Sequence, residues 1–372
     1  MVSVAFTGDI AFSKYFAEAY KTDFIDQEIK DFLCSSDHVV ANVEAPITAG
    51  KIQSDRALNH TMPPQVVDTL LSVNAKIWTL ANNHVMDAKA QGVRDTLDIA
   101  AENGCVTVGA GMDLQEACQP VYLEGAGGIG VFSMVYDRDF LRAGEDQPGA
   151  LTDMDMERIR ANIQRIKKTC RWCVVIAHAG AEFSQLPLPY VRRRYKEYLD
   201  MGADVVIGHH PHVVQNYETF GDKVVFYSLG NFIFDTDYQR NQRFTQYGML
   251  VKLKFEENAF TWENCPVLID REANRVRKGE NPAIFRDISP TQYRLLQSIM
   301  LRDYLRNNRS AAIFSKPANA ERTYKQWLDV SIKRHGLWPT AEFRLGRALS
   351  YLGLWRLSSL KDVKNYIWPN EK

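Results

Sequence analysis

Long apolar runs and an export signal are both missing from this sequence of 372 residues. No stretch approaches the ~18 consecutive apolar residues that a membrane-spanning helix needs. The amino terminus, residues 1–6, lacks the basic region followed by an apolar region that marks a secretory signal. We therefore expect a cytoplasmic protein, and leave open a peripheral attachment to a membrane surface.

Cysteine is scarce as well. The six cysteines are scattered over a chain with no export signal, so we expect reduced thiols rather than a disulfide framework. Cys170 and Cys173 have the spacing of a redox or metal pair, but no second such pair exists for a structural zinc site. The pair also precedes a predicted strand, whereas a thioredoxin-like motif opens a helix after one. A redox or zinc role is therefore the less favoured interpretation.

The chain as a whole has no net charge, but its two parts carry opposite charges. The 45 Lys and Arg side chains balance 45 Asp and Glu, and 45% of the residues are hydrophobic, which excludes a disordered, collagen-like or coiled-coil protein. Residues 286–372 hold 16 basic and 7 acidic side chains, a formal charge of +9, so the first 285 residues carry −9. A basic tail is either a solvated face or a surface for acidic polymers or membranes. Because the longer part is acidic, nucleic acid is not an expected partner.

Short apolar runs alternate with polar segments of helical length, which is typical of a layered α/β domain. We expect strands at residues 2–7, 39–43, 77–81, 106–109, 130–135, 173–177, 205–207, 224–228 and 249–255. We expect helices at residues 15–33, 64–73, 90–103, 153–169 and 190–201. No internal repeat and no low-complexity segment interrupts this order.

The pattern changes near residue 270. Further on, predicted strands give way to basic segments with Leu, Trp and Tyr at helical spacing, at residues 290–307, 320–334 and 340–362. We therefore divide the chain into a first domain, residues 1–270, and a basic, mainly helical C-terminal region, residues 271–372. These helices either pack on the first domain or meet a membrane or a membrane-associated synthase.

A glycine-rich segment, residues 125–130, matches the G-x-G-x-x-G pattern of dinucleotide-binding proteins. That pattern binds a dinucleotide only between a strand and a following helix. Here it lies between two apparent strands, at residues 121–123 and 130–135. It therefore predicts a hairpin turn.

Five predicted strands end in side chains that bind metals or transfer protons. They are Asp9, Asn42 with Glu44, Asn82 with Asn83 and His84, His178, and His209 with His210 and His212. Ligands of open α/β sheets bind at the carboxyl ends of the strands, so we expect these side chains to converge. Carboxylates and imidazoles suit zinc, manganese or iron better than calcium.

Taken together in order, these motifs resemble the capsule synthesis protein CapA family, which is associated with poly-γ-glutamate and capsule biosynthesis. The motifs are Gly8-Asp9, Asn42-Val43-Glu44, Ala81 to Asp87, His178 to Glu182, Gly202 to His212 and Tyr227 to Asp235. The resemblance covers about residues 1–255. It implies a calcineurin-like metallophosphatase fold, a four-layer α-β-β-α sandwich, here with a C-terminal helical appendage.

The resemblance also implies roles for individual residues. Asp9 and His212 would bind a first metal, and Glu44 would stand in the place of a bridging aspartate. The second metal would be bound by Asn83, His178 and His210. In two places the sequence departs from the metallophosphatase pattern: Ala11 stands where an imidazole is expected, and Glu44 is longer than aspartate. One or two divalent ions are therefore expected.

His84 would correspond to the general acid beside the leaving group. Asp87 either orients His84 or caps the helix that follows. We expect Asn42, Asn82, Asn231 and Asp235 to tie loops or support ligands. Glu182 is either a substrate or supporting group or a surface residue, and His209 either faces the site or packs behind it.

Two functions remain open on the sequence. The first is a metal-dependent hydrolase that uses a metal-bound hydroxide on a phosphoester, amide or ester of a capsule-type polymer or its precursor, or on a phosphorylated small molecule. The second is a non-catalytic assembly or export factor with a vestigial metal site, docked on a synthase through its basic helices.

Overall fold

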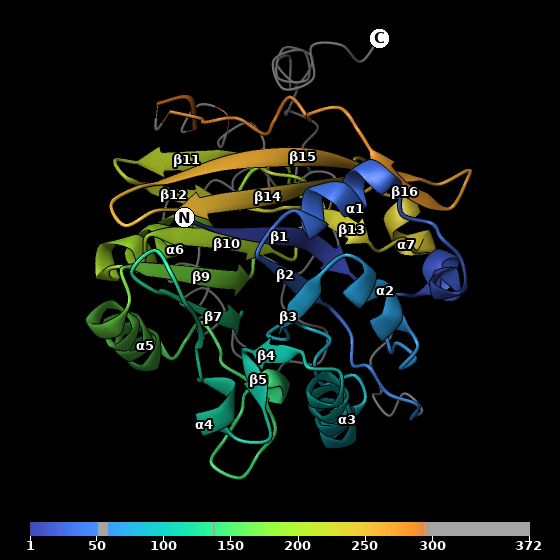
Figure 1. The fold of residues 1–372 in the computed structure, drawn as a ribbon, viewed down its shortest axis with the longest axis horizontal. Helices are drawn as coiled ribbons and strands as arrows, with labels where there is room; N and C mark the ends of the chain where they lie inside the picture. Colours follow the sequence, from blue (N-terminus) through green and yellow to red (C-terminus); the bar gives the residue numbers. More distant parts are fainter. Residues whose placement is uncertain (51–58, 137, 290, 294–295, 297–372) are drawn as a thin grey trace, which may run out of the picture.

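Two β-sheets lie face to face in the computed structural model, and helices cover their outer faces (Figure 1). The structure describes residues 1–50, 59–136, 138–289, 291–293 and 296. In Figure 1, α5 and α6 lie on one side of the molecule and α1, α2 and α3 on the other. The predicted four-layer α-β-β-α sandwich is confirmed.

The first sheet is built around β1 (Val2–Ile10), which pairs in parallel with β2 and antiparallel with β14. Its order is β16 (Arg275–Lys278), β15 (Phe260–Asp270), β14 (Tyr247–Phe255), β1, β2 (His38–Val43), β3 (Ala75–Thr79) and β4 (Val106–Val108). The short β13 (Asn231–Ile233) also pairs with the end of β1. Since β1, β2, β3 and β13 are parallel, their carboxyl ends meet at one edge.

The second sheet has a parallel centre. Its order is β11 (Tyr217–Phe220), β12 (Lys223–Phe226), β10 (Val205–His209), β9 (Trp172–His178), β7 (Ile129–Val135) and β6 (Val121–Leu123). The glycine-rich segment joins β6 to β7, which pair antiparallel, so the predicted hairpin turn is confirmed. A separate pair is formed by β5 (Ala110–Gly111) and β8 (Gly149–Ala150).

The helices depart from the prediction in two ways: the short α4 and α7 were not predicted, and one predicted helix is partly wrong. Their bounds are α1 (Gln27–Cys34), α2 (Val66–Ser72), α3 (Lys89–Glu102), α4 (Leu114–Ala117), α5 (Met156–Thr169), α6 (Pro189–Met201) and α7 (Asp237–Arg240). The helix predicted at residues 15–33 is wrong in its first half, which forms two 3-10 turns, Lys14–Phe16 and Ala19–Lys21. The predicted helix is also interrupted at Ile25, which forms a bridge with Val276 of β16.

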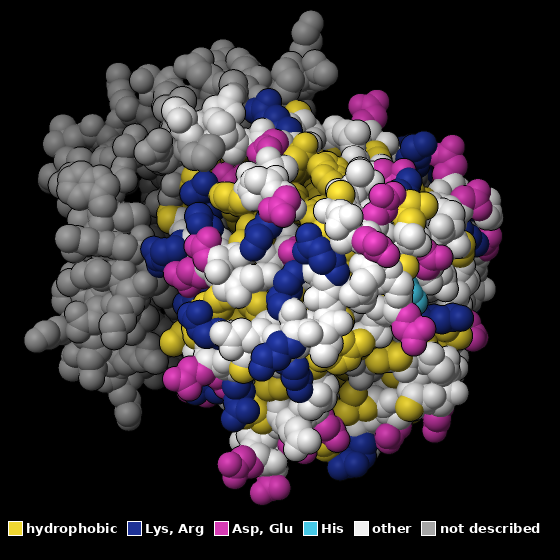
Figure 2. Space-filling view, turned by 60° about the vertical axis from the view of Figure 1, so that its left-hand side comes forward, with side chains coloured by type: hydrophobic (Ala, Val, Ile, Leu, Met, Phe, Trp, Pro, Cys, Tyr) yellow, Lys and Arg dark blue, Asp and Glu magenta, His cyan; other side chains and the backbone are white. Residues whose placement is uncertain are grey.

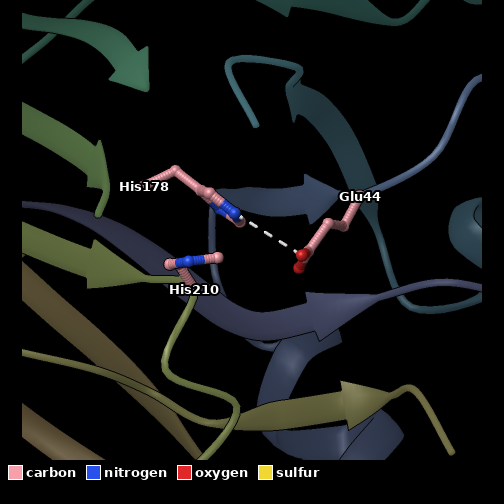
Figure 3. A group of neighbouring side chains, drawn as sticks. All are labelled: Glu44, His178 and His210. Carbon is pink, nitrogen blue, oxygen red and sulfur yellow. Dashed lines mark ion pairs between the residues drawn. The ribbon is translucent and has the colours of Figure 1, made fainter. Parts of the chain in front are cut away.

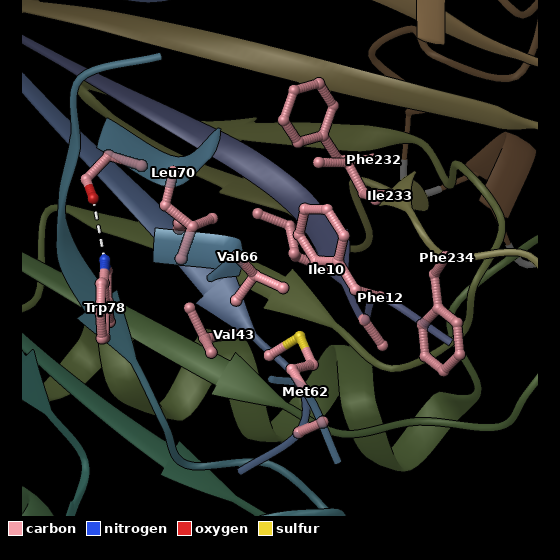
Figure 4. Close-up of a cluster of buried hydrophobic side chains, with 14 of the residues drawn as sticks. Ile10, Phe12, Val43, Met62, Val66, Leu70, Trp78, Phe232, Ile233 and Phe234 are labelled. Atoms are coloured by element: carbon pink, nitrogen blue, oxygen red, sulfur yellow. Dashed lines mark hydrogen bonds between the residues drawn. The ribbon is translucent and has the colours of Figure 1, made fainter. Parts of the chain in front are cut away.

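Alternation along the strands distributes apolar side chains between three buried layers. Val4 and Phe6 of β1 lie in the cluster between the sheets, whereas Ala5 lies in the cluster under α1 and α2. A third cluster joins the second sheet to α5 and α6. Figure 4 shows the cluster of the first sheet, in which Trp78 Nε1 donates a hydrogen bond to the Ala75 carbonyl (2.8 Å). Each large apolar side chain buried in this way contributes roughly 1.5–3 kcal/mol.

Some residues after 270 pack with the two sheets. The strand β16 pairs with β15, and Ile284, Ile288 and Tyr293 are buried in the cluster between the sheets. The division at residue 270 stays a prediction. The predicted helices at 320–334 and 340–362, and most of that at 290–307, lie outside the described residues.

No helix in the part of the chain that the structure describes is long and apolar enough to cross a bilayer. On the face seen in Figure 2, Lys and Arg side chains are interspersed with Asp and Glu over the coloured surface. A mixed surface of this kind favours no single sign of charge in a partner.

Candidate metal centre

The polar ends of strands from both sheets converge between them. Asp9 lies opposite Asn42 of β2 and Asn231 of β13 in the first sheet, and His178 lies opposite His209 in the second. All of these side chains are at most 2% exposed. The convergence expected from the sequence is therefore present.

Two glycines permit this close approach. A Cβ atom at Gly8 would lie 2.3 Å from the Gly230 carbonyl oxygen, which accepts a hydrogen bond from Asp9 N (2.8 Å). At Gly208, a Cβ atom would lie 2.0 Å from the Tyr227 carbonyl oxygen. Any side chain at either position would push apart the strands that present Asp9 and His209.

One group of potential ligands contains Asp9, Glu44 and His212. One ligand atom from each lies within 4.8 Å of the other two. His212 Nδ1 lies 3.1 Å from Asp9 Oδ2, and His212 Nε2 lies 3.6 Å from Glu44 Oε1. These are the residues that the resemblance implies for the first metal.

A second group contains Glu44, His178 and His210 (Figure 3). His178 Nε2 lies 3.4 Å from Glu44 Oε1 and 2.7 Å from Asn83 Oδ1. Figure 3 shows the two imidazoles and the carboxylate directed toward a common point. Glu44 belongs to both groups, as a bridging ligand would.

The residues fit a divalent cation. Glu44 Oε1 and His210 Nδ1 are buried without a hydrogen-bond partner. Buried polar atoms nearly always have one, and a bound ion explains the exceptions. A set of imidazole nitrogens and carboxylate oxygens suits zinc, manganese or iron. The buried groups could therefore hold a metal ion, while the assignment of each ligand stays a prediction.

The pKa values of several residues in the centre depart from their ordinary values. Burial, followed by the nearby Asp9 charge, raises the pKa of Glu44 well above its usual value. Burial lowers the pKa of His178 and brings that of His210 to about 4. Burial opposes the charged form of His212 too, but the bond with Asp9 outweighs it and raises the His212 pKa. Asp9, held by His209 and His212, has a pKa below its ordinary value despite burial.

Several residues at and near the centre have strained backbone angles. His210 (φ 95°) and His212 (φ 57°) adopt the left-handed region, and so do Phe183 (φ 62°) and Lys14 (φ 48°) nearby in the fold. A residue with a Cβ atom there costs about 1–3 kcal/mol, and such residues cluster at functional sites. The loop after β10 is thus less stable than an unstrained loop would be, and it places the imidazoles of His210 and His212 at the centre.

Supporting contacts involve most of the other predicted residues. Asn42 Nδ2 donates to Asp9 Oδ1 (2.8 Å) and Glu44 Oε2 (3.4 Å), and His209 Nδ1 lies 2.9 Å from Asp9 Oδ1. His209 therefore faces the site through Asp9. Asn231 Oδ1 lies 3.0 Å from His212 Nδ1.

Two predicted residues act at a distance from the ligands. Asn82 Nδ2 donates to the Val43 carbonyl (2.8 Å), which fixes the segment before Glu44. Asp235 is fully buried and pairs with Arg240 (2.6 Å) and Arg271 (3.1 Å), so it supports the loop of α7 rather than a ligand.

The pair of His84 and Asp87 lies beside the centre. His84 Nδ1 lies 2.6 Å from Asp87 Oδ2, which also accepts a hydrogen bond from His60 N (2.8 Å). The helix α3 begins after Ala88, without a side-chain cap. Of the two roles open to Asp87, the structure favours orientation of His84.

A cavity of about 350 Å³ opens next to this pair, lined by His84, His212 and Glu182 among others. Tyr238 OH lies 3.4 Å from Glu182 Oε2. His60, which was not among the predicted site residues, lines the same cavity, with its ring 4.6 Å from that of His84. Because His60 stands alone in the sequence, no spacing signal could have indicated this.

The class of protein follows from comparison with known families. Residues 3–236 match the family model described as "Bacterial capsule synthesis protein PGA_cap". The match covers most of the described core and all of the potential ligands. The chain belongs to this family.

Two curated relatives are informative. The chain is 33% identical over 267 residues to "PGA biosynthesis protein CapA" of Bacillus subtilis (strain 168), covering 69% of each chain. It is 28% identical over 270 residues to "Capsule biosynthesis protein CapA" of Bacillus anthracis, covering 69% of this chain and 64% of that one. The chain thus spans about two thirds of the length of these relatives. The predicted CapA resemblance is confirmed.

Among solved structures, a hypothetical protein from Thermus thermophilus is similar with a TM-score of 0.44 and 16% identity. The similarity covers 75% of this chain and 100% of that one. A likeness of this size supports no statement about activity.

Proposed function

We propose that this protein is a metal-dependent hydrolase that acts in the synthesis of a capsule-type polymer such as poly-γ-glutamate. The observation that carries the proposal is Glu44, which belongs to both groups of potential ligands and has a buried Oε1 atom with no hydrogen-bond partner. A carboxylate in this position serves two cations, or one cation that both sheets bind.

The residues that would hold the cations are Asp9, Glu44, Asn83, His178, His210 and His212. A bound divalent cation supplies Lewis acidity, since it lowers the pKa of water from ~15.7 to about 7 and stabilises negative charge at the reacting group. Burial of the ligands excludes bulk water and strengthens this effect.

His84 would transfer a proton to the leaving atom. It lines the cavity while its Nδ1 atom is held by Asp87, so the other ring nitrogen, Nε2, remains to act on a ligand there. General acid catalysis of this kind contributes typically 10²–10⁴-fold. The reacting bond would be a phosphoester, or an amide or ester of the polymer or its precursor.

A non-catalytic assembly factor is the second candidate. The observation that favours it is Ala11, which is fully buried where an imidazole would complete the first metal site. In that case the basic C-terminal region would dock the protein on a membrane-associated synthase, and the metal would serve structure.

Metal content and turnover in the same preparations separate the two candidates. Wild type, Glu44→Gln and His210→Ala would be analysed for bound metal and for hydrolysis of a generic phosphodiester and monoester. Glu28→Gln, a change at an exposed carboxylate, is the matched control. The hydrolase proposal expects metal and turnover in wild type and control, and loss of both in the two variants. Wild type without transition metal would refute it, whereas metal without turnover on these or polymer substrates would favour the assembly factor.

A further inference from the structure

The outer wall of the cavity beside the metal centre carries an unusual lysine. Among the described residues that line this cavity, Lys14 is the only Lys or Arg, while Glu182 and Asp237 contribute two carboxylates. Without Lys14 the described lining would be acidic apart from its histidines. An anionic polymer entering such a cavity would be repelled.

The backbone at Lys14 is strained. Its φ angle of 48° lies in the left-handed region, where a Cβ atom is unfavourable. The 3-10 turn Lys14–Phe16 begins after residues 11–13, which follow the end of β1, the strand that carries Asp9. The strained residue thus stands five positions after a potential metal ligand.

A network of side chains holds Lys14 at the mouth of the cavity. Lys14 Nζ lies 2.9 Å from Asp237 Oδ2, and Tyr15 OH donates to Asp237 Oδ1 (2.5 Å). The Arg240 guanidinium lies 3.3 Å from the centre of the Tyr15 ring and is itself paired with the buried Asp235. Through these contacts the flexible Lys14 side chain is connected to the buried Asp235.

Replacing Asp237 by another anion as the partner of Lys14 costs little free energy. Lys14 and Asp237 are 56% and 59% exposed, and ion pairs at such positions contribute little to stability. An ammonium group has three donors, so it can bind a second anion while it keeps Asp237. Asp237 then acts as a tether that orients the ammonium group.

We propose that Lys14 determines specificity by binding a carboxylate of the anionic polymer next to the residue that occupies the metal centre. The inference rests on the proposed function, because it takes the cavity as the polymer-binding site. Lys14 acts on binding rather than on the bond that is cleaved. Glu182, which lines the same cavity, would repel the carboxylates of a polymer that does not contact Lys14.

Equilibrium binding of two probes tests the role of Lys14. The probes are a γ-linked glutamate pentamer and the γ-linked glutamine pentamer of equal length, titrated into metal-loaded full-length protein by calorimetry. The variants are Lys14→Met, Lys14→Arg and Asp237→Asn, with Lys21→Met as a control. Lys21 is exposed and paired with Glu18, so its loss removes the same charge outside the cavity lining.

The expected result is opposite in sign for the two partners. Lys14→Met weakens binding of the glutamate pentamer about fivefold, because it removes the cation, and Asp237→Asn tightens it about threefold, because the amide oxygen can still accept from Lys14 while the repelling negative charge is gone. Lys14→Arg restores most of the affinity, and Lys21→Met leaves it unchanged. None of the variants alters binding of the glutamine pentamer.

The proposal is overturned if wild type does not bind the glutamate pentamer at millimolar concentration, if Lys14→Met and Lys21→Met behave alike, or if both pentamers respond equally. Since binding is read without turnover, a protein that binds the pentamer through Lys14 but hydrolyses nothing would refute only the proposed hydrolase.

Discussion

The two sheets contribute different chemistry to the same centre. The first sheet provides potential oxygen ligands, Asp9, Glu44 and Asn83, whereas the second provides the imidazoles of His178, His210 and His212 as potential nitrogen ligands. Asp9 lies within β1, and Glu44 directly follows β2, while His210 and His212 occupy a strained loop after β10. Regular strand ends therefore position the carboxylates and His178, and a strained turn positions His210 and His212.

Glu44 belongs to both groups of potential ligands, so its substitution should have the largest effect on metal affinity. Glu44→Gln keeps the shape but removes the charge shared by both groups. We expect metal affinity to fall more than ~100-fold, beyond the 10–100-fold typical of supporting residues. Equilibrium dialysis with elemental analysis measures this. Retention of wild-type metal content by this variant would mean that the sheets do not share a cation.

Asp87 tests whether proton transfer is separate from metal binding. Asp87→Asn removes the charge that orients His84, and Asp87 is not one of the six potential metal ligands. We expect turnover of a phosphodiester to fall by about 10- to 100-fold with unchanged metal content. A variant with reduced metal content would place Asp87 in the metal centre instead.

The two halves should also differ in their response to pH. Burial and Asp9 raise the Glu44 pKa, whereas burial lowers that of His210 to about 4. A cation binds the deprotonated forms, so below the raised Glu44 pKa metal binding displaces a proton from Glu44, whereas above about pH 4 His210 has none to release. Metal affinity should rise with pH, by about tenfold per unit for one proton, until pH exceeds the raised Glu44 pKa.

Titration of the apoprotein with Mn²⁺ at several pH values would show this slope. The raised pKa of His212 adds a second proton in the same direction. An affinity that falls as pH rises would contradict the protonation states assigned to both halves.

The smallest effect concerns the strain on the second-sheet side. His210→Gly and His210→Ala remove the same imidazole, but only glycine relieves a φ angle of 95°. We expect the glycine variant to be more stable than the alanine variant by about 1 kcal/mol. Urea unfolding of the two metal-free variants gives the difference. Equal stabilities would show that the turn is not strained.

The sequence predicted the polar residues at the strand ends better than the strained loop and the cavity. Residues that follow buried strands, such as Glu44 and His178, stood out because apolar runs and polar ends alternate along the chain. The strain at His210 and the cavity beside His84 depend on tertiary contacts that no local pattern encodes.

Several elements escaped prediction for the same reason. β13 has three residues and is held by pairing with the end of β1, and β15 contains Pro266 and charged residues on a half-exposed strand. The segment before α1 was expected to be helical, but Asp26 N donates to the carbonyl of Val276 (2.9 Å), in a strand far along the chain. Distant pairing outweighed local helix propensity there.

The most direct test is a crystal structure of the protein soaked with Mn²⁺, with data collected for anomalous scattering. We predict a peak between the sheets, within ~2.0–2.3 Å of a Glu44 oxygen and of at least one imidazole nitrogen from the second sheet. Ions found only at surface carboxylates, with none beside Glu44 at saturating metal, would contradict the account.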